Sequence, residues 1–337
     1  MNNCTPTRKR HARKIVFRSA LFLIPAGIIG NIVFSLSITN WDFFRAPLTS
    51  FSMRYLPLAV LLALLPWLFH SLRIRLWTDF IGHRFSPADA LYVVLGDELG
   101  SSLTPTAIGG GYVKLGLLIE KGIKPGTAVS LSTIGTLENG VFFALSIPFL
   151  IFITSATRSP VFRAVTGNFV LPSPDPLVFC LIVLACIGTA TMALLLWGKR
   201  ALTQVTRAGR DFLHTYRLVI TEGKKRFAVG IMLTALQWVC RYSVVTALVA
   251  CFGITIHPLH FFLFQWIVFA LTTVIPTPGG SVGAEASFYL IFQAFVPGDI
   301  MGLLTAVWRF LTYYLQMVLG AIFFIMLNTR KLTTGRS

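Results

Sequence analysis

A short fragment that occurs twice constrains the fold of this chain more than any other feature. Residues 105–111 read Pro-Thr-Ala-Ile-Gly-Gly-Gly, and residues 276–280, which begin 171 residues later, read Pro-Thr-Pro-Gly-Gly. Each copy interrupts an apolar stretch, and a shorter apolar stretch and then a long one follow it. Paired, interrupted hydrophobic segments in two halves of a chain are typical of transporters that bind substrate near the bilayer midplane.

The composition is that of a polytopic membrane protein. Of 337 residues, 55% are hydrophobic and 12% are charged, whereas an average soluble domain has about 25% charged residues. The net charge is +17. The Lys and Arg residues that produce it lie between the apolar stretches, as the positive-inside rule expects. This placement argues against a nucleic-acid partner. A basic cytoplasmic surface attracts anionic headgroups, so we expect membrane lipids as partners. No cofactor is expected, and the five cysteines form no C-x-x-C motif that would indicate a metal site.

Apolar stretches of about 20 residues predict the membrane spans. Six qualify, and they cover residues 16–39, 55–76, 127–153, 177–197, 227–252 and 301–327. Two more apolar regions, 88–121 and 258–296, are broken at Pro105–Gly111 and Pro276–Gly283. The piece Val113–Lys121 is too short to span the bilayer at about 1.5 Å per residue. We therefore expect each broken region to be a re-entrant helical hairpin.

The basic segments predict the orientation. The N-terminus (1–14), segment 198–226 and the tail (328–337) are strongly basic, which places both termini in the cytoplasm. Three spans and one hairpin lie in each half, and because three is odd, the second half is inverted. The prediction is an all-α, multi-pass protein of the cell membrane. Its single transmembrane domain covers 15–327, with repeats over 15–153 and 177–327.

The broken tips are the predicted substrate site. A half-helix that begins at membrane depth presents unpaired N–H groups and the positive end of its dipole, which suits a phosphate or another anionic headgroup. The alternative is that the glycines only allow helices to pack closely. The residues predicted to bind substrate are Thr106, Gly109, Gly110, Gly111, Lys114, Glu138, Thr277, Gly279, Gly280, Ser281, Glu285 and Arg309.

Four of these residues are charged and lie in apolar stretches, where a charge is costly without a partner. At the 171-residue offset Lys114 falls on Glu285 and Glu138 falls on Arg309, so the signs are exchanged. We expect Glu285 to pair with Arg309 and Lys114 with Glu138, each within its own repeat. A purely structural role for these pairs is the alternative.

Three further charges lie in apolar stretches. Arg241 has no evident partner within its repeat. Asp97 and Glu98 are adjacent, so they face different sides of a helix, and we expect one of them to face the cavity.

Two motifs carry the resemblance to a known family. Residues 277–286 (Thr-Pro-Gly-Gly-Ser-Val-Gly-Ala-Glu-Ala), followed by 308–314 (Trp-Arg-Phe-Leu-Thr-Tyr-Tyr) and Gly320, resemble the C-terminal signature of the flippase-like family of the lysylphosphatidylglycerol synthase transmembrane region. Residues 103–111 are similar to its N-terminal half-signature. Many members have Gly-Glu-x-x-Arg where residues 110–114 read Gly-Gly-Tyr-Val-Lys, so the Glu is missing and Lys replaces Arg.

The resemblance covers about residues 15–327 and implies a protein that moves or handles lipids or lipid-linked precursors. The best-known members also carry a soluble aminoacyl-transferase domain, for which this chain has no room, so we expect no lysine transfer. The predicted function is a flippase-like transporter of a lipid with an anionic or polar headgroup. The alternatives are a glycosyl- or aminoacyl-transferase of the membrane, an accessory subunit of a lipid-modifying enzyme, or a scaffold.

Overall fold

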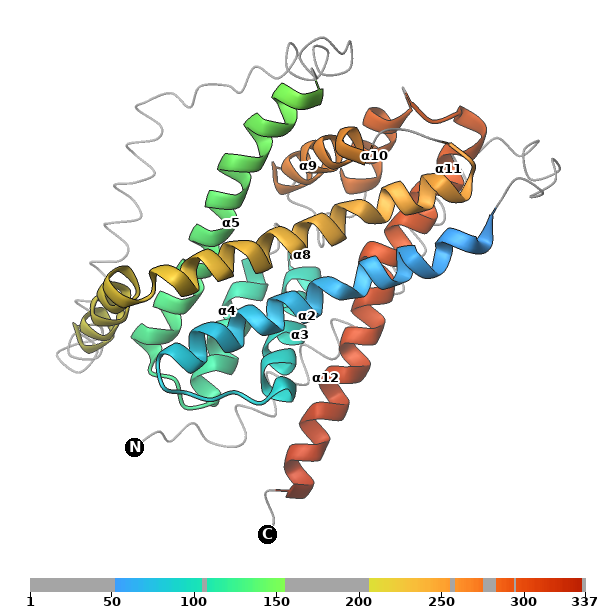
Figure 1. The fold of residues 1–337 in the computed structure, drawn as a ribbon. Coiled ribbons are helices and arrows are strands. Elements are labelled where there is room, and N and C mark those ends of the chain that lie inside the picture. Colours follow the sequence, from blue (N-terminus) through green and yellow to red (C-terminus); the bar gives the residue numbers. More distant parts are fainter. Residues whose placement is uncertain are drawn as a thin grey trace, which may run out of the picture. The chain divides into compact units, whose positions relative to one another are not determined.

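The computed structural model describes residues 52–104, 108–154, 206–254, 258–274, 283–293 and 295–334, and their regular structure is entirely helical (Figure 1). The prediction of an all-α protein is thus confirmed for these residues. The labelled helices are η3 (Met53–Tyr55), α2 (Leu56–Phe80), α3 (Pro87–Leu103), α4 (Ile108–Glu120), α5 (Pro125–Thr154), α8 (Lys224–Cys251), α9 (Pro258–Val274), α10 (Gly283–Phe292), α11 (Gly298–Arg309), the π-helix η5 (Phe310–Tyr314) and α12 (Leu315–Thr334).

Four helical stretches in the described residues are long and apolar enough to cross a membrane. They are Met53–Phe80, Pro125–Thr154, Lys224–Cys251 and Ile300–Leu327. These four coincide with the spans predicted at 55–76, 127–153, 227–252 and 301–327. The spans predicted at 16–39 and 177–197 lie outside the described residues.

The helices repeat at the interval seen in the sequence. Adding 171 to Met53–Phe80 gives Lys224–Cys251, and adding 171 to α3 gives the bounds of α9. The shorter helices α4 and α10 follow, and each precedes a long stretch, α5 or α11 with its continuation. The repeat therefore holds at the level of whole helices, over 53–154 and 224–334.

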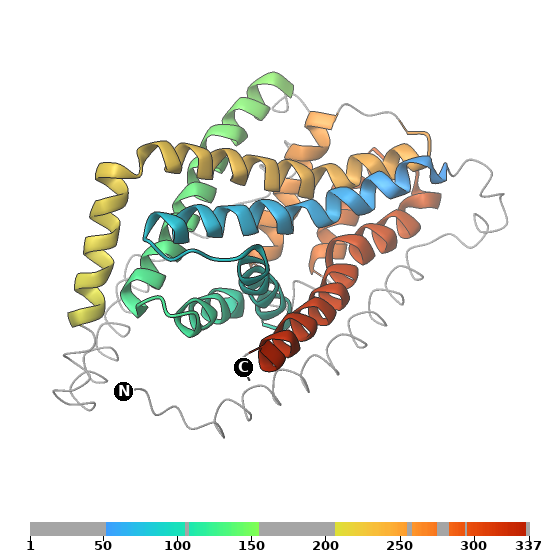
Figure 2. The ribbon, with the colours of Figure 1, turned by 60° about the horizontal axis from the view of Figure 1, so that its bottom comes forward.

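The chain divides into two compact units, residues 1–117 with 229–337, and residues 118–228. In the first unit, α2 and α8 lie side by side and run in opposite directions (Figure 2). The N–H of Ser52 donates to the carbonyl of Cys251 at one end, and Arg73 bonds Thr234 near the other. The first helices of the two repeats are thus antiparallel.

Glycines pack α3 and α4 into an antiparallel hairpin. A Cβ at Gly96 would overlap the side chain of Leu117, and a Cβ at Gly100 would lie 2.9 Å from the carbonyl oxygen of Gly109. A side chain at Gly110 would overlap Ser101. Close approach through small residues is the usual way in which membrane helices pack.

Aromatic rings hold the second hairpin together. Phe261 of α9 stacks on Phe292 of α10 with 5.5 Å between ring centroids, and Phe288 of α10 stacks on Trp308 of α11 at 4.3 Å. With 13 and 10 residues, α4 and α10 are about 20 and 15 Å long. Both are shorter than the hydrocarbon core of about 30 Å.

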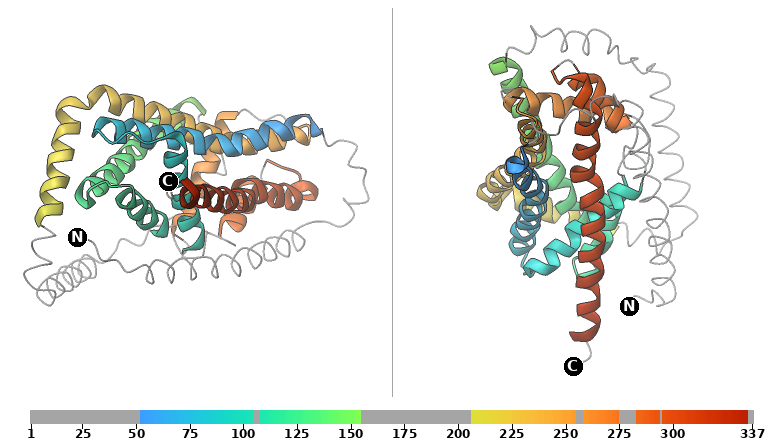
Figure 3. Two further views of the ribbon diagram at one scale, coloured as in Figure 1. Left: turned by 90° about the horizontal axis from the view of Figure 1, so that it is seen from below. Right: turned by 90° about the vertical axis from the view of Figure 1, so that its right-hand side faces the viewer.

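Two further features complete the fold. In the first unit, α11, η5 and α12 follow one another without interruption along the chain (Figure 3), and α12 packs on α3.

In the second unit, a helix over 206–222 packs on the start of α5. There Thr215 Oγ1 donates to Thr127 Oγ1 at 3.2 Å, and a side chain at Gly126 would overlap the carbonyl of Ala208.

Candidate functional site

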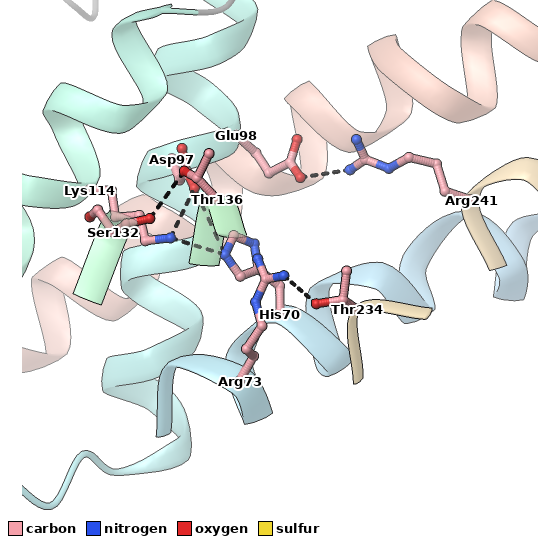
Figure 4. A network of polar contacts seen from close by, with 9 residues as sticks. All are labelled: His70, Arg73, Asp97, Glu98, Lys114, Ser132, Thr136, Thr234 and Arg241. Carbon is pink, nitrogen blue, oxygen red and sulfur yellow. Dashed lines mark hydrogen bonds and ion pairs between the residues drawn. The ribbon is translucent and has the colours of Figure 1, made fainter. Parts of the chain in front are cut away.

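Three charged or titratable side chains from three helices meet in the first unit (Figure 4). Nζ of Lys114 on α4 lies 3.4 Å from Nε2 of His70 on α2. Oδ2 of Asp97 on α3 lies 3.9 Å from each of these two nitrogens. We call these three residues the histidine cluster. All three side chains are less than one-fifth exposed.

Glu98, the residue after Asp97, lies on a different face of α3 and contacts Arg241. Nη2 of Arg241, on α8, donates to Oε1 of Glu98 at 2.7 Å (Figure 4). Asp97 and Glu98 therefore face different sides of α3, as expected, and each has a cationic neighbour. The partner of Arg241, absent from its own repeat, comes from the first repeat.

The predicted ion pair between Glu285 and Arg309 is present. Nε of Arg309 donates to Oε1 of Glu285 at 2.9 Å, and the two side chains are 8% and 1% exposed. The guanidinium carbon of Arg309 also lies 4.1 Å from the ring centroid of Tyr313, a cation–π contact. The pairing of Glu285 with Arg309 is confirmed.

Both arginines line one cavity of about 120 Å³. Helices α8, α9, α10 and α11 and the π-helix η5 supply its walls. Its lining residues are Arg241, Tyr242, Gln265, Val268, Phe269, Thr272, Ala284, Trp308, Arg309 and Thr312.

Four residues of the cavity wall also carry buried hydrogen-bond donors that have no partner among the described residues. They are Nε of Arg241, the hydroxyl of Tyr242, Nε2 of Gln265 and Nε1 of Trp308. A buried donor without a partner is rare in folded proteins and demands an explanation. Four such donors beside two guanidinium groups suit a ligand that is rich in acceptor oxygens and carries negative charge.

Arg241, which lines the cavity, and His70 hold equivalent places in their helices. Arg241 is ten residues from the last residue of α8, and His70 is ten residues from the last residue of α2. Ten residues rise about 15 Å along a helix, which is half of the hydrocarbon core.

The predicted tips divide into two groups. Thr106, Thr277, Gly279, Gly280 and Ser281 lie outside the described residues. The first tip was expected to extend from Thr106 to Gly111, but Gly109–Gly111 form the first turn of α4.

The structure favours a packing role for two of these glycines. The N–H of Gly109 is already bound by Oγ1 of Thr104 at 2.8 Å. A side chain at Gly109 would overlap Thr104, and one at Gly110 would overlap Ser101. A Cβ at Gly111 would meet no described atom within 4 Å.

The remaining predicted pair concerns Lys114 and Glu138. Lys114 has the contacts with Asp97 and His70 given above, whereas Glu138 is fully buried on α5, in the other unit. Their pairing stays a prediction.

His70 and Arg73 were missed in the sequence analysis, although His70 carried a signal. His70 falls on Arg241 at the 171-residue offset, so the repeat could have pointed to it. Arg73, whose Nη1 donates to Oγ1 of Thr234 at 2.7 Å, has no charged counterpart at that offset.

Comparison with known proteins identifies the family. The model of the lysylphosphatidylglycerol synthase transmembrane region matches residues 15–320. The chain belongs to this family. A relative is a UPF0104 membrane protein of Archaeoglobus fulgidus, 24% identical over 278 residues that cover 78% of this chain and 84% of that protein. Membership of the family and the four apolar spans agree on a multi-pass membrane protein.

Proposed function

We propose that this protein translocates a lipid or lipid-linked precursor with an anionic headgroup across the membrane. The observation that carries the proposal is the cavity beside the start of α10, which is lined by Arg241, by Arg309 and by residues with unpartnered buried donors. Its chemistry matches a phosphate-bearing headgroup, while acyl chains would stay in the surrounding lipid. The family takes its name from a synthase of a phosphatidylglycerol derivative, so phosphatidylglycerol is the first probe.

The repeat supports a transport mechanism. If α2 and α8 both cross the bilayer, their antiparallel packing means that the two repeats enter it from opposite faces. Inverted repeats with short, broken helices around a midplane site are the architecture of many alternating-access transporters. We propose that α3–α4 and α9–α10 are re-entrant hairpins in this arrangement.

The ion pairs suggest how the headgroup would be held and released. Glu98 and Glu285 neutralise the two arginines, so the site carries little net charge without substrate. An entering phosphate competes with these carboxylates for the guanidinium groups. Because each arginine can re-form its ion pair with Glu98 or Glu285, the headgroup can dissociate after it has bound.

The test is translocation in vesicles of phosphatidylcholine that contain the protein and a trace of fluorescent phosphatidylglycerol. A reductant added outside quenches only the outer leaflet, so movement of the inner-leaflet tracer appears as a slow additional loss of fluorescence. We expect this phase with wild-type protein and its strong reduction with Glu285→Gln/Arg309→Gln. This double variant removes a cation from the cavity without leaving either charge buried alone.

Two outcomes would contradict the proposal. Protein-free and protein-containing vesicles with the same kinetics would argue against translocation. Chemically altered tracer, detected by chromatography after the assay, would instead favour the transferase alternative.

A further inference from the structure

The two repeats carry different kinds of charge at equivalent positions. Arg241, Glu285 and Arg309 in the second repeat fall on His70, Lys114 and Glu138 in the first. An arginine stays protonated in proteins, whereas histidine can gain or lose a proton near neutral pH. The cavity is thus built on fixed cations, and the histidine cluster is built on groups that exchange protons.

Within the first unit, three further charged residues lie near the histidine cluster. Arg73 comes from α2, Glu98 from α3 and Arg241 from α8, and the described side chains of α12, which packs on α3, carry no charge up to Leu327. With Asp97 and Lys114 the set has three cations and two anions, before any charge on His70. The site is therefore net positive.

We propose that the histidine cluster is a proton-binding site that couples proton movement to the lipid movement proposed above, on which this inference rests. Ionisable residues inside a membrane often mark proton relays. Here three of them from three different helices lie within 4 Å of one another. Nδ1 of His70 is buried and has no hydrogen-bond partner among the described residues.

The geometry favours a proton over a metal cation as the coupling ion. A sodium ion needs several oxygen ligands and would meet Lys114 within 4 Å of the cluster's carboxylate. A proton needs a single lone pair and forms a covalent O–H bond. The described residues also include no group of three His, Cys, Asp or Glu side chains that could hold a metal ion.

The proton step can be written atom by atom. The Lys114 ammonium can only donate, so Nε2 of His70 accepts from it and Nδ1 carries the ring proton. A proton arriving from water bonds to an oxygen of Asp97 and converts the carboxylate to a carboxylic acid. Lys114 then loses its ion pair with Asp97 but keeps its contact with His70, and deprotonation of Asp97 toward the opposite side restores the ion pair.

The cluster is linked to the cavity through two adjacent residues of α3. Asp97 belongs to the cluster, and Glu98 holds Arg241, which lines the cavity. An anionic headgroup near Arg241 adds negative charge and favours protonation of the cluster. By linkage, protonation favours the headgroup to the same extent, so proton and anionic lipid move together.

The proton site can be tested without any transport. Infrared difference spectra of purified protein in lipid nanodiscs compare samples at about pH 8 and about pH 5. We expect the wild type to gain a carboxylic-acid carbonyl band at low pH that Asp97→Asn lacks and that is shifted in His70→Gln. A band unchanged in both variants would overturn the assignment, even if lipid translocation is confirmed.

Coupling is tested in the vesicle assay with an imposed pH gradient. We expect the gradient to speed wild-type translocation of fluorescent phosphatidylglycerol at least about fivefold, the lower end of typical coupling. Asp97→Asn and His70→Gln should translocate at one rate with or without the gradient. His260→Gln on α9 is the matched control, because it removes another imidazole that lies outside the cluster, and it should respond as the wild type does.

The outcomes separate the two proposals. The infrared band without lipid movement would contradict the proposed function but keep the proton site. If the wild type translocates lipid at the same rate with and without the pH gradient, the result would contradict coupling but leave the proposed function standing. Thermal unfolding of each variant shows that it is folded, and if Asp97→Asn does not fold, His70→Gln alone decides the coupling test.

Discussion

His70 and Arg241 hold the same position in the two repeats, 171 residues apart in the chain and each ten residues from the end of its helix. Their helices, α2 and α8, lie antiparallel, and each residue contacts an ionised side chain of the first hairpin. The hairpin α3–α4 of the first repeat thus contacts a titratable imidazole through Lys114 and a permanently charged guanidinium through Glu98.

The pair Glu285–Arg309 is expected to contribute to stability as well as to the cavity. Glu285→Gln leaves the guanidinium of a pair that is less than one-tenth exposed without its anion, at a cost of about 3–5 kcal/mol. The charge swap Glu285→Arg/Arg309→Glu should recover part of this loss. The free energy of unfolding in detergent measures both effects, and a double variant less stable than either single one would rule out direct pairing.

The consecutive glycines of α4 are expected to respond differently to the same substitution. A Cβ at Gly110 would overlap Ser101, so Gly110→Ala should destabilise the hairpin by about 1–3 kcal/mol. The added Cβ of Gly111→Ala would meet no described atom within 4 Å, so this change should be neutral, or stabilising by up to about 1 kcal/mol. Equal unfolding free energies for the two variants would show that α3 and α4 do not pack through Gly110.

The orientation can be tested with single cysteines in a cysteine-free background. Met53, at the start of the first described span, is exposed, as are His83 after its end and Lys225 at the start of α8. In intact cells an impermeant thiol reagent should label Met53→Cys but neither His83→Cys nor Lys225→Cys. Because Met53 and Lys225 begin equivalent helices, labelling of both from outside would contradict the inverted repeat.

Much of the helical framework was predictable because each span is a long apolar stretch bounded by charges. Four of the six predicted spans coincide with helices, and α10 begins at Gly283, one residue before the expected start near Ala284. The Glu285–Arg309 pair was predictable because both charges stand in one repeat, where a buried charge needs a nearby partner.

Contacts between the repeats were not predictable in the same way. The Glu98–Arg241 bond joins residues 143 positions apart, and it depends on how α3 packs near α8. The close packing of Gly109 and Gly110 was also not predictable from the sequence. Their sequence suggests an open loop, yet they lie within α4, where tight packing against α3 requires the absence of a side chain.

In the proposed mechanism, the cavity lined by Arg241 and Arg309 binds the headgroup during translocation. Trp308→Phe tests it most directly, because the change removes one unpartnered donor from the cavity wall and keeps an aromatic ring against Phe288. Trp77→Phe, a buried tryptophan of α2 that does not line the cavity, is the matched control.

The measurement is the rate of fluorescent phosphatidylglycerol translocation in vesicles with equal amounts of folded protein. A lost hydrogen bond to a charged group costs about 1.5–3 kcal/mol, so Trp308→Phe should slow translocation at subsaturating lipid about tenfold or more. Trp77→Phe should match the wild type. Equal rates for Trp308→Phe and Trp77→Phe would contradict the account.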